Sequence, residues 1–146
     1  MANVRGCELP DDLLYDVENH TWFKEVEDGN VQIGMTTIAT ALAGELVAFT
    51  PKKIGRKVRA GKSCATVESG KWVGPAKSVA AGEVIAVNEE LVENPSLANE
   101  DPYKAWMVVI DPVGWDEAKA TLTPGTEVAG PYEAKMDADG FEGCDG

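Results

Sequence analysis

Residues 61–82, GKSCATVESGKWVGPAKSVAAG, place Lys71 almost midway between two similar small-residue turns. The sequence around the first turn, VRAGKSCA, matches that around the second, VAAGEVIA, at four positions. Between the turns, residues 63–69 alternate as a strand with one buried face does. Gly70 then predicts a tight turn, because glycine reaches positive φ without steric cost. The stretch therefore predicts a β-hairpin with Lys71 exposed at its tip.

Composition restricts the size and class of the protein. A chain of 146 residues has the length of one domain. Its 25 acidic and 13 basic residues give a formal charge of -12, which argues against nucleic-acid binding and favours basic-faced protein partners, unless the acidity serves only solubility. The sequence has no signal-like apolar run and no stretch near the ~20 apolar residues of a membrane span. We therefore expect a cytoplasmic monomer.

The sequence offers few candidates for catalytic or metal-binding residues. Cys7, Cys64 and Cys144 are an odd number without CxxC spacing, so neither a disulfide scaffold nor a cysteine metal site is indicated. Cys7 and Cys144 can meet only if both chain ends lie on one side, and Cys64 is expected to pack in the core. With a single histidine and no phosphate-binding glycine loop, the chain is expected to be a substrate of enzymes and not an enzyme.

Alternating apolar residues and turn signals predict further elements. A short helix is expected at residues 36–44, where Ile38 and Leu42 are four apart and Gly44 is a stop signal. The expected strands are residues 14–26 and 31–35 as a hairpin, 45–50, 83–88 and 106–110, with a polar loop between Asn94-Pro95 and Asp101-Pro102. Several short strands with one short helix predict a compact β-sandwich or barrel.

The remaining segments are expected to lie outside the core. Residues 1–13 predict a loose arm before a domain at residues 14–111. Residues 112–146 predict a short helix, at 114–122, and a mobile acidic tail. Residues 51–59 carry five basic residues, and we interpret them as a solvated loop, with a docking patch as the alternative.

Four blocks of residues occur in order between about Leu14 and Ile110. They are ENHTW at 18–22, IGMT at 33–36 leading to GELV at 44–47, VESGK at 67–71, and GEV at 82–84 running on to 88–89 and 94–95. With their spacing, these blocks resemble the lipoyl-carrying H protein of the glycine cleavage system, and the segment from Asn99 to Trp106 is also family-like.

The sequence departs from that family beside the lysine. Around the matching lysine, the sequence of ordinary H proteins is similar to Glu-Ser-Val-Lys or Glu-Ser-Thr-Lys, followed by small residues and an aspartate. Here Gly70 precedes Lys71, bulky Trp72 follows it, and Pro75 stands where the aspartate would be. In this the chain resembles the H-protein-like lipoate-binding protein of bacterial sulfur oxidation, which works with a heterodisulfide-reductase-like complex.

The resemblance implies both a fold and a function. The fold is mostly β, a flattened β-sandwich of the lipoyl/biotinyl-carrier type (a barrel-sandwich hybrid) with short helices at its periphery. The function is that of a swinging arm, with lipoic acid attached covalently to Lys71, that shuttles sulfur-containing intermediates or reducing equivalents. The implied partners are a lipoate ligase or other lipoylating enzymes, dihydrolipoamide dehydrogenase and the heterodisulfide-reductase-like complex.

Three alternatives stay open. The first is an ordinary glycine cleavage H protein that carries an aminomethyl group. The second is an unmodified interaction domain that kept the fold. A biotin carrier is disfavoured, because Gly70 and Trp72 flank the lysine where that family resembles Met-Lys-Met.

Other site residues are expected around Lys71. The resemblance implies that Glu68, with Ser69 and Gly70, belongs to the surface recognised during attachment. It also implies that His20 lies near the cleft that receives the loaded arm, although a lone histidine is more often structural. Trp72 is expected to be a lid over the arm or part of a partner interface.

Overall fold

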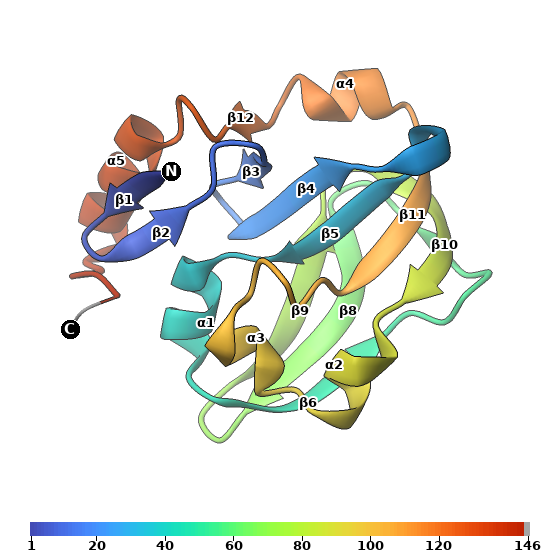
Figure 1. Cartoon of the computed structure of the whole chain (residues 1–146), viewed down its shortest axis with the longest axis horizontal. Coiled ribbons are helices and arrows are strands. Elements are labelled where there is room, and N and C mark those ends of the chain that lie inside the picture. The colour runs from blue at the N-terminus through green and yellow to red at the C-terminus, as the bar shows by residue number, and fades with distance from the viewer. Residues whose placement is uncertain (145–146) are drawn as a thin grey trace.

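The computed structural model describes residues 1–144 as a mostly β protein with short peripheral helices (Figure 1). One sheet has seven strands in the order β12-β3-β4-β5-β11-β10-β7, and a second has three in the order β6-β8-β9. All neighbouring strands pair antiparallel. The expected fold class, a lipoyl-carrier-type sandwich, is confirmed.

The strands are short, and most lie where alternation predicted them. In the larger sheet they are β3 (Leu14–Asp16), β4 (Thr21–Glu25), β5 (Val31–Met35), β7 (Lys57–Val58), β10 (Ala81–Val87), β11 (Val108–Val113) and β12 (Thr123–Pro124). In the smaller sheet they are β6 (Leu46–Pro51), β8 (Lys62–Ser69) and β9 (Val73–Ser78).

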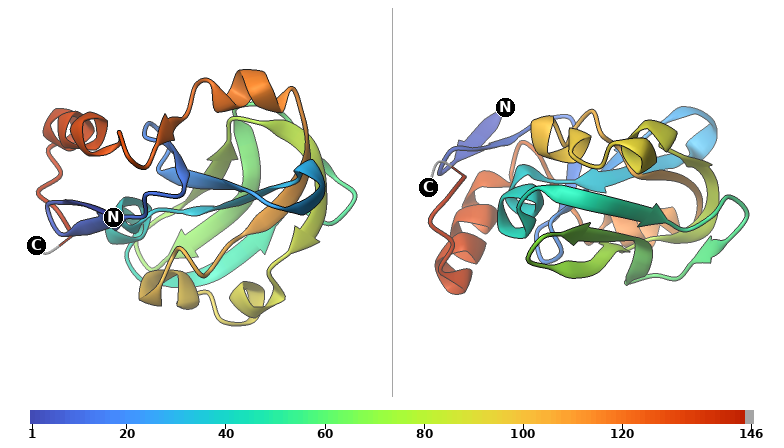
Figure 2. Two further views of the ribbon diagram at one scale, coloured as in Figure 1. Left: turned by 45° about the horizontal axis from the view of Figure 1, so that its top comes forward. Right: turned by 90° about the horizontal axis from the view of Figure 1, so that it is seen from below.

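The core lies between the two sheets (Figure 2). Ile33 and Ile110 from the larger sheet and Val67 from the smaller one are among the side chains buried there. A β-bulge near the start of β8 changes the alternation, so that Cys64 and Ala65 are both buried. The strict alternation expected for residues 63–69 would put Cys64 on the same face as the exposed Glu68, and the bulge makes that wrong; the expected place of Cys64 in the core is confirmed.

The predicted helix after the first hairpin is confirmed as α1 (Thr37–Ala43). The Thr36 hydroxyl oxygen caps its start by accepting a hydrogen bond from the backbone N–H of Ala39, at 3.2 Å. Gly44 ends the helix with φ of 83°, which a side chain rarely adopts. Ile38 is buried as expected, but Leu42 is exposed and turns toward the site described below.

The segment between β10 and β11 is more ordered than expected. The expected polar loop contains the one-turn helix α3 (Leu97–Glu100), and another one-turn helix, α2 (Glu89–Glu93), comes directly before Asn94-Pro95. The expected helix at 114–122 is confirmed as α4 (Trp115–Lys119), while a 3-10 turn, η1 (Glu27–Gly29), joins β4 to β5. None of the helices in the described part of the chain has the length and apolar character needed to cross a bilayer.

The two ends of the chain pack together as a unit that we call the terminal clamp. It consists of the hairpin β1 (Ala2–Val4) and β2 (Cys7–Leu9), the helix α5 (Ala129–Asp139) and a disulfide between Cys7 and Cys144 (Figure 1). The expected loose arm and mobile tail are therefore corrected. Tyr132 and Met136, four residues apart, bury one face of α5 in a second apolar cluster with Leu9. The last two residues of the expected tail lie outside the described part.

Candidate functional site

Lys71 lies in the turn between β8 and β9, as predicted. The backbone N–H of Ser69 donates to the carbonyl oxygen of Trp72 at 2.7 Å, which closes the turn. The buried Ser69 hydroxyl also accepts a bond from the backbone N–H of Lys71 at 3.3 Å. Gly70 does not have the positive φ that was expected, so the turn forms without a left-handed residue. The base of the lysine side chain is thus held by two short-range hydrogen bonds.

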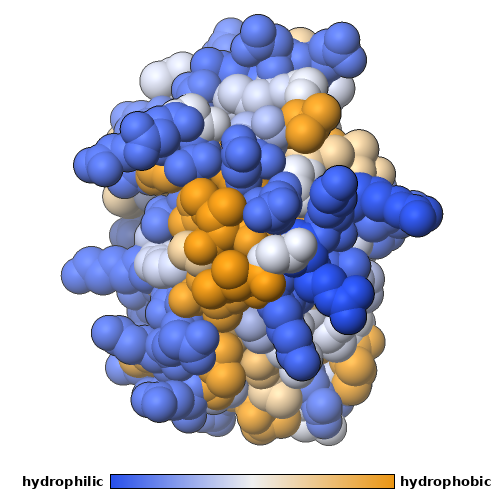
Figure 3. Space-filling view, turned by 90° about the vertical axis from the view of Figure 1, so that its right-hand side faces the viewer, coloured by the Kyte–Doolittle hydropathy of each residue, from blue (hydrophilic) through white to orange (hydrophobic). Residues whose placement is uncertain are grey.

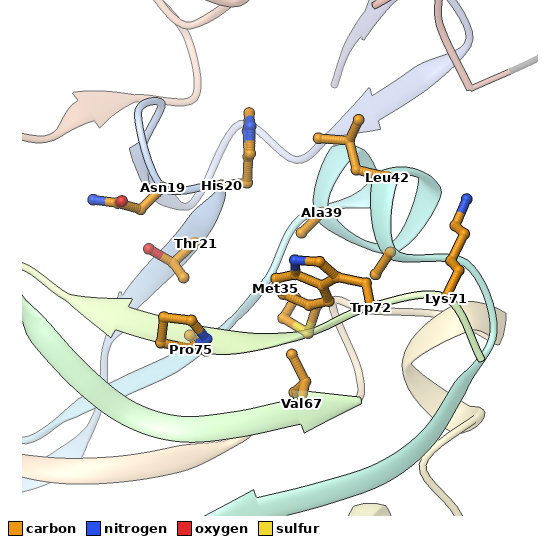
Figure 4. A pocket seen from close by; sticks show the side chains of 12 residues that line it. Asn19, His20, Thr21, Met35, Ala39, Leu42, Val67, Lys71, Trp72 and Pro75 are labelled. Atoms are coloured by element: carbon orange, nitrogen blue, oxygen red, sulfur yellow. The ribbon is translucent and has the colours of Figure 1, made fainter. Parts of the chain in front are cut away.

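The Lys71 side chain runs past the end of α1. A Cβ built on Gly44 would lie 3.1 Å from Cε of Lys71, so the aliphatic stem passes over a residue without a side chain. In Figure 4 the amine points away from the neighbouring Trp72, and the Lys71 side chain is exposed. A primary amine in this position is accessible to a modifying enzyme.

Beside Lys71 lies a cavity of about 470 Å³. Its walls come from distant parts of the chain (Figure 4). They include Val67, Trp72 and Pro75 from the hairpin, Ala39 and Leu42 from α1, Asn19 and His20 from the turn before β4, and Thr21 from the first position of β4. Most of the lining is apolar, and the polar side chains other than Lys71 lie together on the side of the turn before β4. The cavity can therefore receive an apolar arm whose tip reaches polar groups.

Trp72 points into this cavity and is 42% exposed. Its indole lies over Gly74, where an added Cβ would come within 2.2 Å of the ring. A side chain at Gly74 would therefore displace the indole. Trp72 can therefore adopt this position only because residue 74 is a glycine.

His20 lies across the cavity from the hairpin, with a left-handed backbone at φ of 57°. Its ring stacks on Tyr132 of α5, with the centroids 5.8 Å apart, and Nδ1 is 3.3 Å from the tyrosine hydroxyl oxygen. Burial lowers the pKa of His20, and the nearby Lys135 adds to this effect. The neutral imidazole can therefore donate or accept a hydrogen bond at the cavity wall.

Glu68 and Cys64 do not line this cavity. Glu68 is exposed on β8, paired with Ala48 and Val73 on the neighbouring strands. Cys64 is fully buried, and burial raises the pKa of its thiol to about 12. A thiol with so high a pKa stays protonated and is unreactive. Cys64 is therefore a packing residue.

The expected residues thus separate into two groups. The structure brings His20 and Trp72 to one cavity with Lys71, and it places Glu68 on the exposed strand beside the turn. Sequence reasoning missed Leu42 and Tyr132. The four-residue spacing of Tyr132 and Met136 was the available signal for α5. Within residues 1–144 no cluster of three metal-ligating side chains occurs.

Comparisons with known proteins agree with this geometry. The family model described as "Glycine cleavage H-protein" matches residues 13–134. The chain is 49% identical over 134 residues to glycine cleavage system H protein 5 of Aquifex aeolicus, covering 88% of this chain and 90% of that one. It is 43% identical over 132 residues to the probable glycine cleavage system H protein 2 of Sulfurisphaera tokodaii, covering 88% and 89%.

A solved structure gives the same result. The crystal structure of a glycine cleavage system H protein from Mycobacterium marinum superposes with a TM-score of 0.72 at 31% identity, over 90% of this chain and 99% of that one. Proteins of this family are lipoyl carriers and not enzymes, and their lipoic acid is attached covalently to a lysine. The chain described here belongs to the glycine cleavage H-protein family.

Proposed function

We propose that Lys71 carries the lipoic acid and that the arm transports an aminomethyl group in glycine cleavage. The observation that supports this most directly is the exposed amine at a hairpin tip beside a mostly apolar cavity. The relatives favour this function over the sulfur-oxidising one that the hairpin sequence suggested first, because those reported above are named as glycine cleavage H proteins.

Attachment changes the chemistry of the lysine in a useful way. An amide bond between Nζ of Lys71 and the lipoic acid carboxyl removes the positive charge of the amine. A neutral arm can enter the apolar cavity without the large cost of desolvating a cation. The hydrogen-bonded turn at Ser69 keeps the base of the arm fixed while the arm itself moves.

The cavity offers different surroundings to the two parts of a loaded arm. Val67 and Trp72 give apolar contacts for the hydrocarbon and sulfur atoms. Asn19 and His20, at the other end, offer hydrogen-bonding groups to a small polar load such as an aminomethyl group. Because the pKa of His20 is lowered, its ring stays neutral near pH 7 and does not repel a protonated amine.

The proposed partners are the enzymes that attach the arm and reoxidise it. A lipoate ligase or another lipoylating enzyme attaches it, with Glu68, Ser69 and Gly70 as part of the surface it recognises. Dihydrolipoamide dehydrogenase reoxidises it after transfer. We place this cycle in the cytoplasm.

A second candidate function is transport of sulfur-containing intermediates to a heterodisulfide-reductase-like complex. The observation that favours it is the pair Trp72 and Pro75, which line the cavity where ordinary members have small residues and an aspartate. The indole adds an apolar surface suited to a sulfur adduct. It also excludes partners shaped to fit a small residue at that position.

One experiment separates the two functions. Lipoylated protein is combined with the other glycine cleavage components of its organism, and glycine decarboxylation is followed. We expect turnover with the wild-type chain and none with Lys71→Arg. Trp72→Ala shows whether the indole limits this reaction. If the lipoylated wild-type chain does not support decarboxylation, while its deletion abolishes growth on reduced sulfur compounds, the second function replaces the first.

A further inference from the structure

The segment that runs from the end of β6 through β7 to the first residue of β8 is the most basic part of this acidic protein. Residues 52–62, which we call the basic loop, contain six of the thirteen basic residues of the chain. All six are exposed. They are Lys52, Lys53, Arg56, Lys57, Arg59 and Lys62.

Within residues 1–144, most of the positive charge of the basic loop is not balanced by ion pairs. Arg5, Lys119 and Lys135 form salt bridges with carboxylates. In the part of the chain that the structure describes, no basic-loop side chain makes an ion pair within 4.0 Å. The nearby acidic residue Glu83 faces Lys57 across the β10–β7 pair, and it offsets only one of the six charges.

Backbone hydrogen bonds hold this loop in place. Gly55 N–H donates to the carbonyl oxygen of Val84 at 2.8 Å, and Val84 N–H donates to that of Arg56 at 2.8 Å. The N–H of Lys52 donates to the carbonyl oxygen of Cys64 at 3.0 Å. The cations are therefore displayed from a fixed edge of the sheet, which lowers the entropy that a partner must remove on binding.

Apolar side chains accompany the cations. Ile54, in the middle of the basic loop, is 64% exposed, and Ile85 on the adjacent β10 is 38% exposed. Figure 3 shows this end of the molecule, where hydrophobic residues gather in the centre and strongly hydrophilic ones lie along one side. An apolar patch bordered by charged residues is typical of a protein interface.

The basic loop and Lys71 lie at opposite ends of β8. That strand leads from the loop to the lysine hairpin, and its eight residues span ~26 Å. The loop therefore does not contact the base of the arm. It forms a second surface, separate from the cavity.

We propose that the basic loop docks the carrier onto an acidic surface of an enzyme that uses its arm. Because the rest of the chain is acidic, an acidic partner is repelled everywhere except at this loop, which fixes the orientation of approach. An interface of about 800 Å² per partner is roughly 30 Å across, so one enzyme can contact the loop and still meet the arm. This inference rests on the carrier function proposed above.

The test compares two charge-reversed chains with the same net charge. In one, Lys53→Glu is combined with Arg56→Glu; in the matched control, the exposed Lys24→Glu is combined with Lys104→Glu. The Kd of each lipoylated chain for dihydrolipoamide dehydrogenase, and for the other glycine cleavage enzymes of the organism, is measured at low and high salt. Equal thermal melting of the variants shows that both are folded.

We expect the loop variant to bind at least one of these enzymes roughly tenfold more weakly at low salt, with less difference at high salt, where screening is strong. The control should bind like the wild type. Equal affinity of the two variants, no binding by the wild type, or loss of a self-associated form in the loop variant alone would overturn the proposal. Normal binding without turnover would instead count against the carrier function.

Discussion

The lysine hairpin and the terminal clamp are stabilised in opposite ways. The hairpin joins strands that are neighbours in sequence, and its turn depends on bonds between residues two or three positions apart. The clamp joins the two ends of the chain, and its disulfide links residues 137 positions apart. Lys71 is thus positioned by contacts between residues close in sequence, whereas the terminal clamp is stabilised by contacts between the two ends of the chain. The clamp reaches the cavity beside the hairpin where its Tyr132 stacks on His20.

The largest effect on stability is expected from the disulfide. Replacing Cys7→Ser together with Cys144→Ser removes a link that closes nearly the whole chain. The free energy of unfolding should fall by about 4 kcal/mol, because the unfolded chain gains entropy. Urea denaturation measures this difference, and lipoylation of the folded protein should be unchanged.

Reductant provides the control for this prediction. It should destabilise the wild-type chain and leave the double serine variant unaffected, because Cys64 is buried and unpaired within the described residues. A wild-type chain that unfolds at the same urea concentration with and without reductant would show that the bridge adds no stability.

A somewhat smaller effect is expected from Tyr132, which is fully buried between the clamp and the site. Tyr132→Ala leaves a cavity and should cost about 3 kcal/mol, whereas Tyr132→Phe removes only the hydroxyl group and should cost about 1 kcal/mol. Chemical denaturation of both variants tests this order. Equal losses would mean that the hydroxyl contact with His20, and not packing, supplies the stability.

The difference between the two regions also explains what the sequence predicts. The lysine hairpin, α1 and β10 follow from short-range patterns, such as the alternation in β8 and the stop at Gly44. The cysteine pairing could not be derived, because spacing along a chain does not say which ends meet. Helix α5 has only a narrow apolar face, and its burial depends on the β1–β2 hairpin.

In the site, too, some positions could be predicted from neighbouring residues and others depend on tertiary packing. Lys71 and Trp72 could be placed at one turn from adjacent residues alone. That His20, Leu42 and Pro75 line one cavity depends on the packing of three separate elements, which spacing does not reveal. The bulge that buries Cys64 is likewise set by its partner strand β9.

The smallest stability effect is expected from the titration of His20, which lines the cavity and stacks on Tyr132 of the clamp. Burial lowers its pKa, with Lys135 acting in the same direction and Asp139, Asp16 and Glu18 opposing it. Between the unfolded pKa of about 6.5 and the lower folded pKa, the unfolded chain binds more protons. Stability should therefore be complete above about pH 6.5 and fall as the pH decreases through this window.

His20→Gln removes this proton uptake and serves as the comparison. Urea denaturation of both chains between pH 5 and 8 should show the wild type losing more stability than the variant on acidification. Parallel curves would mean that His20 titrates alike in the folded and unfolded chains.

The central claim is that Lys71 is the acceptor of lipoic acid, and intact-mass measurement tests it most directly. The wild-type chain, Lys71→Arg and the matched control Lys77→Arg are each incubated with a lipoate ligase, ATP and lipoic acid. Arginine keeps the charge but cannot form the amide. We predict one lipoyl mass increment for the wild type and for Lys77→Arg, and none for the folded Lys71→Arg. An increment retained by Lys71→Arg would contradict the account.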